Sequence, residues 1–270
     1  MVNNINKKDC VKIIQLTDTH LFSNDSLLFG VNCNKTFDKV IDHIYKHELH
    51  DTDLILLTGD LSQDESQGSY QYLLNAFKPF QIPVIWIPGN HDNLNLMDAT
   101  FSKSSFFFRM KQLELKHWIF IFLNTQLEGE INGFINQDDF ISIKNGIENG
   151  ALFNKKIALI MHHHPVSVDT PLIDKYIINN QEELWKNIRN SNVELAICGH
   201  VHGDYLIHHN NVKIESAPAT CFQFKKGSTT LDIENLVGYK IHYFEQGNHH
   251  SKSVIWDVTN EISTNSKMAN

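Results

Sequence analysis

The chain has 270 residues, 41% of them hydrophobic, and is long enough to bury a sizeable core in one large domain or two small ones. Its net charge of −8 and pI near 6.0 give no basic surface of the kind that binds nucleic acid. No apolar run is long enough to span a bilayer, so we expect one globular domain with no nucleic-acid or membrane partner.

The ends of the chain and its cysteines bear on location. The first twelve residues are polar and of mixed charge, without the apolar segment of a secretory signal, so the expected location is the cytoplasm. Cys10, Cys33, Cys198 and Cys221 are widely separated, which predicts reduced thiols rather than a disulfide framework or a zinc knuckle. The unusual feature of the composition is its 16 histidines.

The first predicted strand covers residues 11–17 and ends before Asp18 and His20. If the backbone stays extended there, both side chains point to the same side and converge. For this triplet alone, a turn cap at Asp18 and a solvated His20 would be the ordinary interpretation. The spacing of apolar residues predicts a helix over 34–50, with Asn34 or Thr36 as its N-cap.

Two further strands end in polar residues. Residues 53–58 form a nearly continuous apolar run, as in a parallel strand covered on both faces, and Gly59 and Asp60 follow it. A helix over 67–77 then leads to a strand over 82–87 and the sequence Pro-Gly-Asn-His-Asp at 88–92. In that turn, Asn90 offers an amide oxygen that a divalent metal accepts, and His91 can titrate near neutral pH. Alone, the pentapeptide is more often a surface loop that caps a helix.

The middle of the chain predicts strands over 106–108 and 118–123 and a helix over 137–147. Asn124, Glu128 and Glu130 lie between these elements and are expected to form a solvated connection. An apolar strand over 156–161 then ends in three histidines, His162–His164. A helix over 181–189 precedes a strand over 193–198, which ends in Gly199-His200-Val201-His202.

The last part of the chain alternates in short segments. Strands are predicted over 205–209 and 212–216, joined by a tight turn at Asn210-Asn211, and over 229–233, 239–244 and 254–258. We expect residues 1–258 to form a single domain and residues 259–270 to form a disordered polar tail. His249 and His250 are expected to be exposed.

Five strands thus end in candidate metal ligands, and ligands of open α/β sheets bind outside these ends. Two cations about 3.5 to 4 Å apart need about four ligands each and one bridging carboxylate. A parsimonious allocation gives the first cation Asp18, His20 and His202, the second Asn90, His162 and His200, and places Asp60 between them. Because Asn90 is neutral, the centre keeps a slight positive charge that attracts a phosphodiester anion.

The order Asp-x-His, Gly-Asp, Gly-Asn-His-Asp, His and Gly-His-x-His resembles the calcineurin-like metallophosphoesterases, from Val11 to about Phe224. The flanking sequences are similar to bacterial class III cyclic 3′,5′-AMP phosphodiesterases. They are Thr17-Asp18-Thr19-His20-Leu21-Phe22, Thr58-Gly59-Asp60-Leu61-Ser62-Gln63-Asp64, His162-His163-His164-Pro165 and Ala219-Thr220-Cys221-Phe222-Gln223-Phe224.

The resemblance implies an α/β fold, a four-layer α/β/β/α sandwich with a dimetal site at its top. It implies Asp60 as the bridge, the ligands allocated above and His91 as the catalytic imidazole beside the scissile bond. Asn90, His91, His202 and His164 would contact the substrate, whereas His163 would point away from His162. Asn124 stands where related enzymes often carry an aspartate, and this departure removes no metal ligand.

The activity that the resemblance implies is hydrolysis of 3′,5′-cyclic AMP to 5′-AMP by attack of a metal-bound hydroxide, with two divalent ions of iron, manganese or zinc. One alternative is an enzyme of the same fold that acts on another phosphodiester or nucleotide. Another is a non-catalytic binding scaffold, which predicts substituted ligand positions, and the sequence has none. The identity of the metal, the preference between cyclic AMP and cyclic GMP, and the oligomeric state, monomer or homodimer, stay open.

Overall fold

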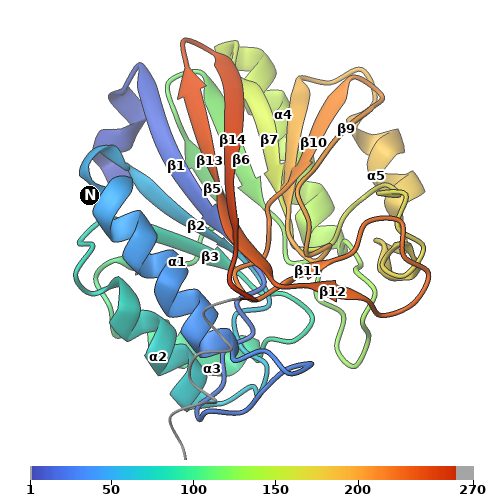
Figure 1. The fold of residues 1–270 in the computed structure, drawn as a ribbon. Coiled ribbons are helices and arrows are strands. Elements are labelled where there is room, and N and C mark those ends of the chain that lie inside the picture. The colour runs from blue at the N-terminus through green and yellow to red at the C-terminus, as the bar shows by residue number, and fades with distance from the viewer. Residues whose placement is uncertain (1, 260–270) are drawn as a thin grey trace, which may run out of the picture.

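The computed structural model describes residues 2–259, and two six-stranded β-sheets packed face to face dominate it (Figure 1). The first sheet has the strand order β14-β13-β1-β2-β3-β4. Strands β1 to β4 run parallel; at one edge β13 pairs antiparallel with β1, and β14 pairs antiparallel with β13. The six strands are β1 (Cys10–Leu16), β2 (Leu54–Thr58), β3 (Val84–Ile87), β4 (Phe107–Phe108), β13 (Leu236–Glu245) and β14 (Asn248–Asp257).

The second sheet has the order β5-β6-β7-β8-β10-β9, with β6, β7, β8 and β10 parallel. Its strands are β5 (Gln112–Glu114), β6 (Trp118–Phe122), β7 (Lys156–Ile160), β8 (Val193–Cys198), β9 (Tyr205–His209) and β10 (Val212–Ser216). A short pair, β11 (Gln223–Phe224) and β12 (Ile233–Glu234), lies apart from both sheets. Asn210 and Asn211 both have positive φ in the turn between β9 and β10, which confirms the predicted tight turn.

Helices cover the outer face of each sheet (Figure 1). The first sheet carries α1 (Cys33–His47), α2 (Gln67–Phe77) and α3 (Leu94–Phe101), and the second carries α4 (Gln137–Phe153) and α5 (Gln181–Ile188). Short 3-10 helices lie at Val2–Lys7, Leu49–Asp51 and Asp174–Tyr176. The predicted four-layer α/β/β/α sandwich is therefore confirmed.

The apolar strand sequences follow from this layering. Along β7, Ala158 and Ile160 face the core between the two sheets, whereas Ile157 and Leu159 face the helices. Because successive side chains point to opposite faces and both faces are buried, the run from Ile157 to Ile160 is apolar throughout.

Some local predictions are wrong. The N-cap of α1 is Asn32, which accepts from the Lys35 amide at 3.0 Å, and not Asn34 or Thr36. The Asn34 amide instead holds both backbone groups of Phe22. Of the strand predicted over 229–233, only Ile233 is in a strand, where it pairs with Phe224. Helix α3 and strand β5 were not predicted.

His249 is also not exposed as expected. It is partly buried, and its Nε2 lies 3.0 Å from His242 Nδ1. Its ring packs 4.7 Å from the Phe244 ring because β14 pairs along the whole of β13. His250 is exposed, as expected. Of the tail predicted over 259–270, residues 260–270 lie outside the described residues.

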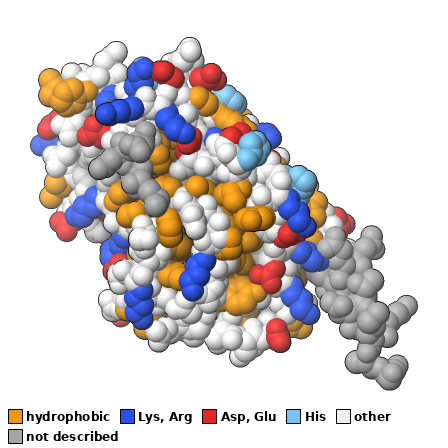
Figure 2. Space-filling model, turned by 90° about the vertical axis from the view of Figure 1, so that its left-hand side faces the viewer, with side chains coloured by type: hydrophobic (Ala, Val, Ile, Leu, Met, Phe, Trp, Pro, Cys, Tyr) orange, Lys and Arg blue, Asp and Glu red, His pale blue; other side chains and the backbone are white. Residues whose placement is uncertain are grey.

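The surface is mixed in character. Figure 2 shows Lys and Arg interspersed with Asp and Glu over one face, around a central group of hydrophobic side chains. The net negative charge is therefore not gathered into one acidic field on that face. Within residues 2–259, none of the helices combines the length and the apolar character needed to cross a bilayer.

Candidate active site

The carboxyl ends of five parallel strands, β1, β2, β3, β7 and β8, meet at one end of the sandwich. Side chains tie the two sheets together at this end. Gln15 donates to the Cys198 carbonyl at 2.9 Å, and Asp18 accepts from the His200 amide at 3.0 Å. The loops that follow the strands are thereby brought to one place, as expected for a ligand site of parallel sheets.

Five of the predicted ligands adopt a left-handed backbone conformation. Asp18, His20, Asp60, His200 and His202 have φ of 52°, 44°, 52°, 70° and 41°. The extended backbone expected around Asp18 and His20 is therefore wrong. Residues other than glycine adopt such angles at a cost, and they persist where surrounding contacts fix them, typically at functional sites.

Two glycines permit the close approach of the loops after β2 and β3. A Cβ on Gly89 would lie 2.2 Å from Asp60 Oδ1, and one on Gly59 would lie 2.5 Å from His162 Nδ1. Gly59 also has a φ of +96°, which favours glycine. No larger residue fits at either position without moving Asp60 or His162.

Asp92, the last residue of the Pro-Gly-Asn-His-Asp turn, locks these loops together. Its carboxylate accepts from the amides of Leu61, Ser62 and Gly89 at 2.9 to 3.1 Å. The Tyr70 hydroxyl adds a fourth donor at 3.2 Å. Burial raises the pKa of Asp92 to about 6, although these donors oppose that shift. Asp92 thus fixes the backbone on which Asp60, Asn90 and His91 stand.

The first predicted ligand group, Asp18, His20 and His202, is brought together by the structure. His202 Nε2 lies 3.1 Å from His20 Nε2 and 3.5 Å from Asp18 Oδ1. The Phe222 carbonyl, which only accepts, fixes the proton of His202 on Nδ1 at 3.1 Å, and Gln63 Oε1 lies 2.7 Å from His20 Nδ1. Both Nε2 atoms therefore present lone pairs to each other.

The second predicted group, Asn90, His162 and His200, forms beside the first. His162 Nδ1 donates to the Thr58 carbonyl at 2.7 Å, so its Nε2 is free to coordinate, 3.2 Å from Asn90 Oδ1. His200 Nε2 is buried without a hydrogen-bond partner among the described residues. Asp60 Oδ2 lies between the groups, 3.3 Å from His162 Nε2 and 3.7 Å from His20 Nε2.

This donor set fits cations. Two ring nitrogens that present lone pairs to each other repel, and so do a ring nitrogen and an oxygen that both present lone pairs. A buried nitrogen without a hydrogen-bond partner costs folding free energy. Cations placed among these atoms remove both penalties, and imidazole, carboxylate and amide are suitable ligands. The carbonyl and amide oxygens behind the rings orient the imidazoles, which is the usual arrangement around metal-binding histidines.

Charge within the group is strongly coupled. Burial raises the pKa of the Asp18 carboxyl to about 7. Burial lowers the pKa of His162, but the adjacent Asp60 carboxylate outweighs this and raises it to about 9. Burial acts to raise the pKa of Asp60, and His162 reverses the effect and holds it well below its usual range. Without metal, a proton on His162 thus takes the place of a cation.

Metal binding is therefore expected to strengthen with rising pH. Below a pH of about 7, both Asp18 and His162 release a proton on binding, and between about 7 and about 9 only His162 does. Each displaced proton changes the apparent affinity by about tenfold per pH unit. Calorimetric titration of the metal-free protein with Mn²⁺ in buffers of different ionisation enthalpy measures both quantities. An affinity that does not change with pH would contradict this assignment of protons.

His91 is half-buried beside the ligand group. Its amide donates to Asp60 Oδ1 at 2.9 Å, and its ring lies edge-on to His20 at 5.1 Å. Within residues 2–259, neither ring nitrogen has a hydrogen-bond partner. The ring borders two cavities, of about 510 and 210 Å³.

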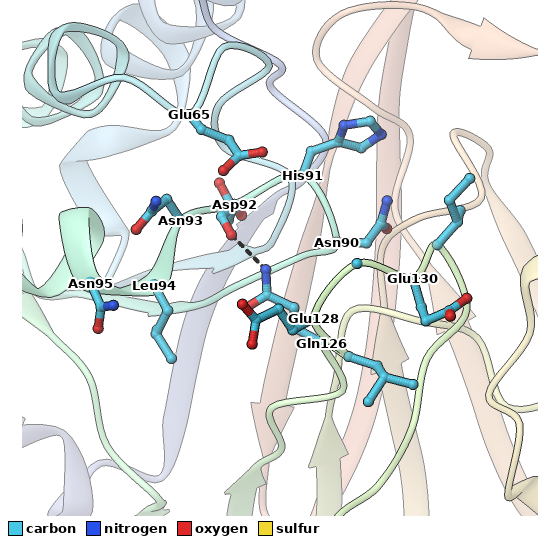
Figure 3. Close-up of a pocket in the computed structure, with 13 residues that line it drawn as sticks. Glu65, Asn90, His91, Asp92, Asn93, Leu94, Asn95, Gln126, Glu128 and Glu130 are labelled. Carbon is cyan, nitrogen blue, oxygen red and sulfur yellow. Dashed lines mark hydrogen bonds between the residues drawn. The ribbon is translucent and has the colours of Figure 1, made fainter.

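Figure 3 shows the larger cavity, in which the His91 ring points away from Asp92 into open space. Glu65, Glu128 and Glu130 line it, and Gln126 donates to the Asp92 carbonyl. Glu128 and Glu130 are exposed, as predicted, although they border a cavity instead of forming a featureless connection. The side-chain oxygen of Asn124 accepts from the Gln126 backbone amide, and the backbone amide of Asn124 donates to Asp139.

The other two adjacent histidines lie outside the ligand group. His163 contacts Thr125 Oγ1 at 2.8 Å and the Ile131 carbonyl at 3.0 Å, which engages both ring nitrogens. His164 was expected to contact the substrate, but it is fully buried, lines neither cavity and lies 3.4 Å from Asp174. The His164 ring stacks on His200 with 5.6 Å between centroids, so it packs behind the ligand group and does not reach either cavity.

Sequence reasoning missed several residues that shape the site. Gln63 orients His20, and Asp174 holds the loop after β7 through Ser167, Val168 and Thr170. Gln63 lies in the segment that follows Asp60, which offered a signal. The backbone carbonyls that orient His162 and His202 belong to Thr58 and Phe222, and no side-chain pattern identifies them.

The two packed sheets with a cation-binding group at their strand ends define a metallophosphoesterase fold. A dimetal phosphatase from Danio rerio shares this fold, with a TM-score of 0.63 at 10% identity over 92% of this chain and 99% of that chain. Residues 11–204 match the family described as calcineurin-like phosphoesterase. The chain therefore belongs to this family, whose members use a dimetal centre.

Curated relatives are similar along most of the chain. A probable cyclic nucleotide phosphodiesterase of Coxiella burnetii is 36% identical over 240 residues, 88% of this chain and 95% of that protein. A 3′,5′-cyclic adenosine monophosphate phosphodiesterase of Haemophilus influenzae is 33% identical over 233 residues, 85% of this chain and 84% of that protein.

Proposed function

We propose that this protein hydrolyses 3′,5′-cyclic AMP to 5′-AMP. The observation that carries the proposal is the convergence of seven side chains suited to cation binding beside the unpaired ring of His91. The similarity to proteins named as cyclic nucleotide phosphodiesterases supports the choice of substrate. We also propose that residues 1–258 form one catalytic domain that acts in the cytoplasm, in agreement with its four free thiols.

Two cations would be held by the groups described above. Asp18, His20 and His202 would hold the first, Asn90, His162 and His200 would hold the second, and Asp60 would contact both. Nitrogen and oxygen ligands without thiolate suit iron, manganese or zinc. When bound, such a pair supplies a hydroxide nucleophile at neutral pH and neutralises charge on the phosphoryl oxygens.

The chain's own residues position and protonate the substrate. The His91 backbone is anchored to Asp60, so its ring is held at the mouth of both cavities. From there Nδ1 or Nε2 can donate a proton to the departing 3′ oxygen. Asn90 and His202 also line the smaller cavity, where they would contact the phosphoryl group.

The larger cavity favours a substrate that carries one phosphate. Its lining includes the carboxylates of Glu65, Glu128 and Glu130, and no Lys or Arg is among its lining residues. A substrate with further phosphates next to His91 would meet like charges there, which costs binding free energy. A cyclic monophosphate, neutral apart from its single diester charge, avoids this repulsion.

Phosphorus NMR of 3′,5′-cyclic AMP with the manganese-loaded protein tests the proposal. We expect conversion to 5′-AMP, loss of that conversion in Asn90→Ala, and normal conversion in the matched control Asn145→Ala, an exposed asparagine of α4 that lines neither cavity. A parallel sample contains 2′,3′-cyclic AMP. If an aryl phosphodiester were cleaved while the 3′,5′ ester stayed intact, the metal chemistry would stand and the cyclic AMP assignment would fall.

A further inference from the structure

The smaller cavity joins the candidate metal centre to an aromatic wall. His20, Asp60, Asn90, His200 and His202 line one side of it. The other side is apolar and consists of Leu28, Phe29, Ile131, Ile173, Tyr176, Phe222 and Phe224. Since the two sides are continuous, a molecule whose phosphoryl group lies at the metal ligands places its remaining atoms against aromatic rings.

Phe222 and Phe224 are fixed parts of this wall. The Phe224 ring stacks on His202, with 4.5 Å between ring centroids and an angle of 30° between ring planes. Phe222 is buried and lies 4.9 Å from the same imidazole. Phe224 is held by the pairing of β11 with β12. Phe222 is held by the hydrogen bond that its carbonyl accepts from His202 Nδ1.

Phe29 faces them from the loop between β1 and α1, the blue loop at the bottom of Figure 1. Its ring meets Phe222 edge-to-face at 5.8 Å, yet its side chain is 54% exposed. Phe29 thus lines a cavity beside the candidate metal ligands and is still half open to solvent. Its ring therefore has contact area available for a ligand.

The backbone at Phe29 is unusual for a bulky residue. Leu28 and Val31 exchange two hydrogen bonds of 2.9 Å, which closes a two-residue turn. Both central residues have positive φ, 50° at Phe29 and 84° at Gly30. Asn, Asp or Gly is preferred at the first of these positions, and a phenylalanine there is strained. Such outliers concentrate at ligand-binding sites.

We propose that Phe29, with Phe222 and Phe224, forms the binding site for the nucleobase, and that Phe29 stacks on the base from the solvent-exposed side of the cavity. This inference rests on the proposed function, since it assigns the non-phosphate part of that substrate. A cavity of about 210 Å³ is smaller than the roughly 300–1,000 Å³ of sites for larger ligands, so it suits one base and its sugar. Aromatic side chains bind bases through stacking, which tolerates different bases.

Steady-state kinetics with two substrates test the assignment. The substrates are 3′,5′-cyclic AMP and the base-free methyl ribofuranoside 3′,5′-cyclic phosphate. We expect Phe29→Ala to raise the KM for cyclic AMP about tenfold or more, the scale of one lost stacking contact. The kcat of Phe29→Ala for cyclic AMP is expected to stay within about twofold of wild type, and so are its kcat and KM for the base-free ester. Leu27 is 58% exposed in the same loop but does not line the cavity, so Leu27→Ala is expected to leave kcat and KM unchanged with both substrates.

A binding measurement separates this inference from the proposed function. Fluorescence of 2-aminopurine riboside 5′-monophosphate, an analogue of the product, is expected to be quenched by the manganese-loaded protein and by Leu27→Ala, but not by Phe29→Ala. If no variant hydrolyses cyclic AMP but quenching depends on Phe29, the base site stands and the proposed function fails. If cyclic AMP is hydrolysed with an unchanged KM and quenching in Phe29→Ala, the base site is overturned.

Discussion

Asp60→Asn is expected to lower kcat/KM for 3′,5′-cyclic AMP by at least about 10³-fold, the upper range for removing one electrostatic stabiliser from an active site. Asp60 Oδ2 is close to both ligand groups, 3.3 Å from His162 Nε2 and 3.7 Å from His20 Nε2. An amide keeps the shape of the side chain, and its oxygen can still accept from the His91 amide. The substitution therefore removes the charge between the two cations with little other change.

Metal content distinguishes this explanation from a folding defect. We expect the wild-type protein to bind two cations and Asp60→Asn to bind at most one tightly, while its thermal unfolding without metal stays cooperative. Asp98→Asn provides the matched control, because Asp98 is half-exposed, pairs with Arg109 and lines neither cavity. Two tightly bound cations together with near-normal turnover in Asp60→Asn would remove Asp60 from the metal centre.

The parallel strands and the ligand group at their ends were both accessible from the sequence for one physical reason, whereas the four-layer arrangement was implied by the resemblance to a known family. Parallel strands covered on both faces need apolar side chains at every position, so their ends are marked by an abrupt change to polar residues. At β2 that change occurs at Gly59 and Asp60, and at β8 it occurs at Gly199 and His200. The strand ends of an α/β sheet are also where ligands bind, so the same signal located both.

What the sequence did not predict depends on contacts distant along the chain. Asn34 has the residue type of an N-cap, but its amide binds Phe22, and Asn32 caps α1 instead. Residues 229–232 alternate as a strand would, yet only Ile233 and Glu234 find a partner strand. His249 is partly buried because the β13–β14 pairing places it against His242.

The aromatic wall is a second example of this limit. Phe29 looks like any exposed loop residue until the turn that it forms is known, and Phe222 lies 193 positions further along the chain. Only the structure shows that their rings meet at 5.8 Å beside the metal ligands. Residues that choose a substrate come from such loops, whereas residues that hold the metals come from the strand ends.

His91→Ala is expected to lower kcat for 3′,5′-cyclic AMP by about 10² to 10⁴-fold, the range for loss of a general acid. Metal content should stay near that of wild type, because the His91 amide bond to Asp60 is a backbone contact that alanine retains. Near-normal turnover in this variant would exclude His91 from the chemistry.

The leaving group decides whether His91 acts as a proton donor or only as a positive charge. The 3′ oxygen of cyclic AMP departs as a basic alkoxide and needs a proton, whereas a p-nitrophenolate leaving group does not. If the His91 ring donates that proton, His91→Ala slows hydrolysis of cyclic AMP far more than hydrolysis of bis(p-nitrophenyl) phosphate. Added imidazole should restore part of the cyclic AMP activity, because the truncated side chain leaves space at the mouth of both cavities. Equal losses with both esters would show instead that His91 stabilises charge on the phosphoryl oxygens without transferring a proton.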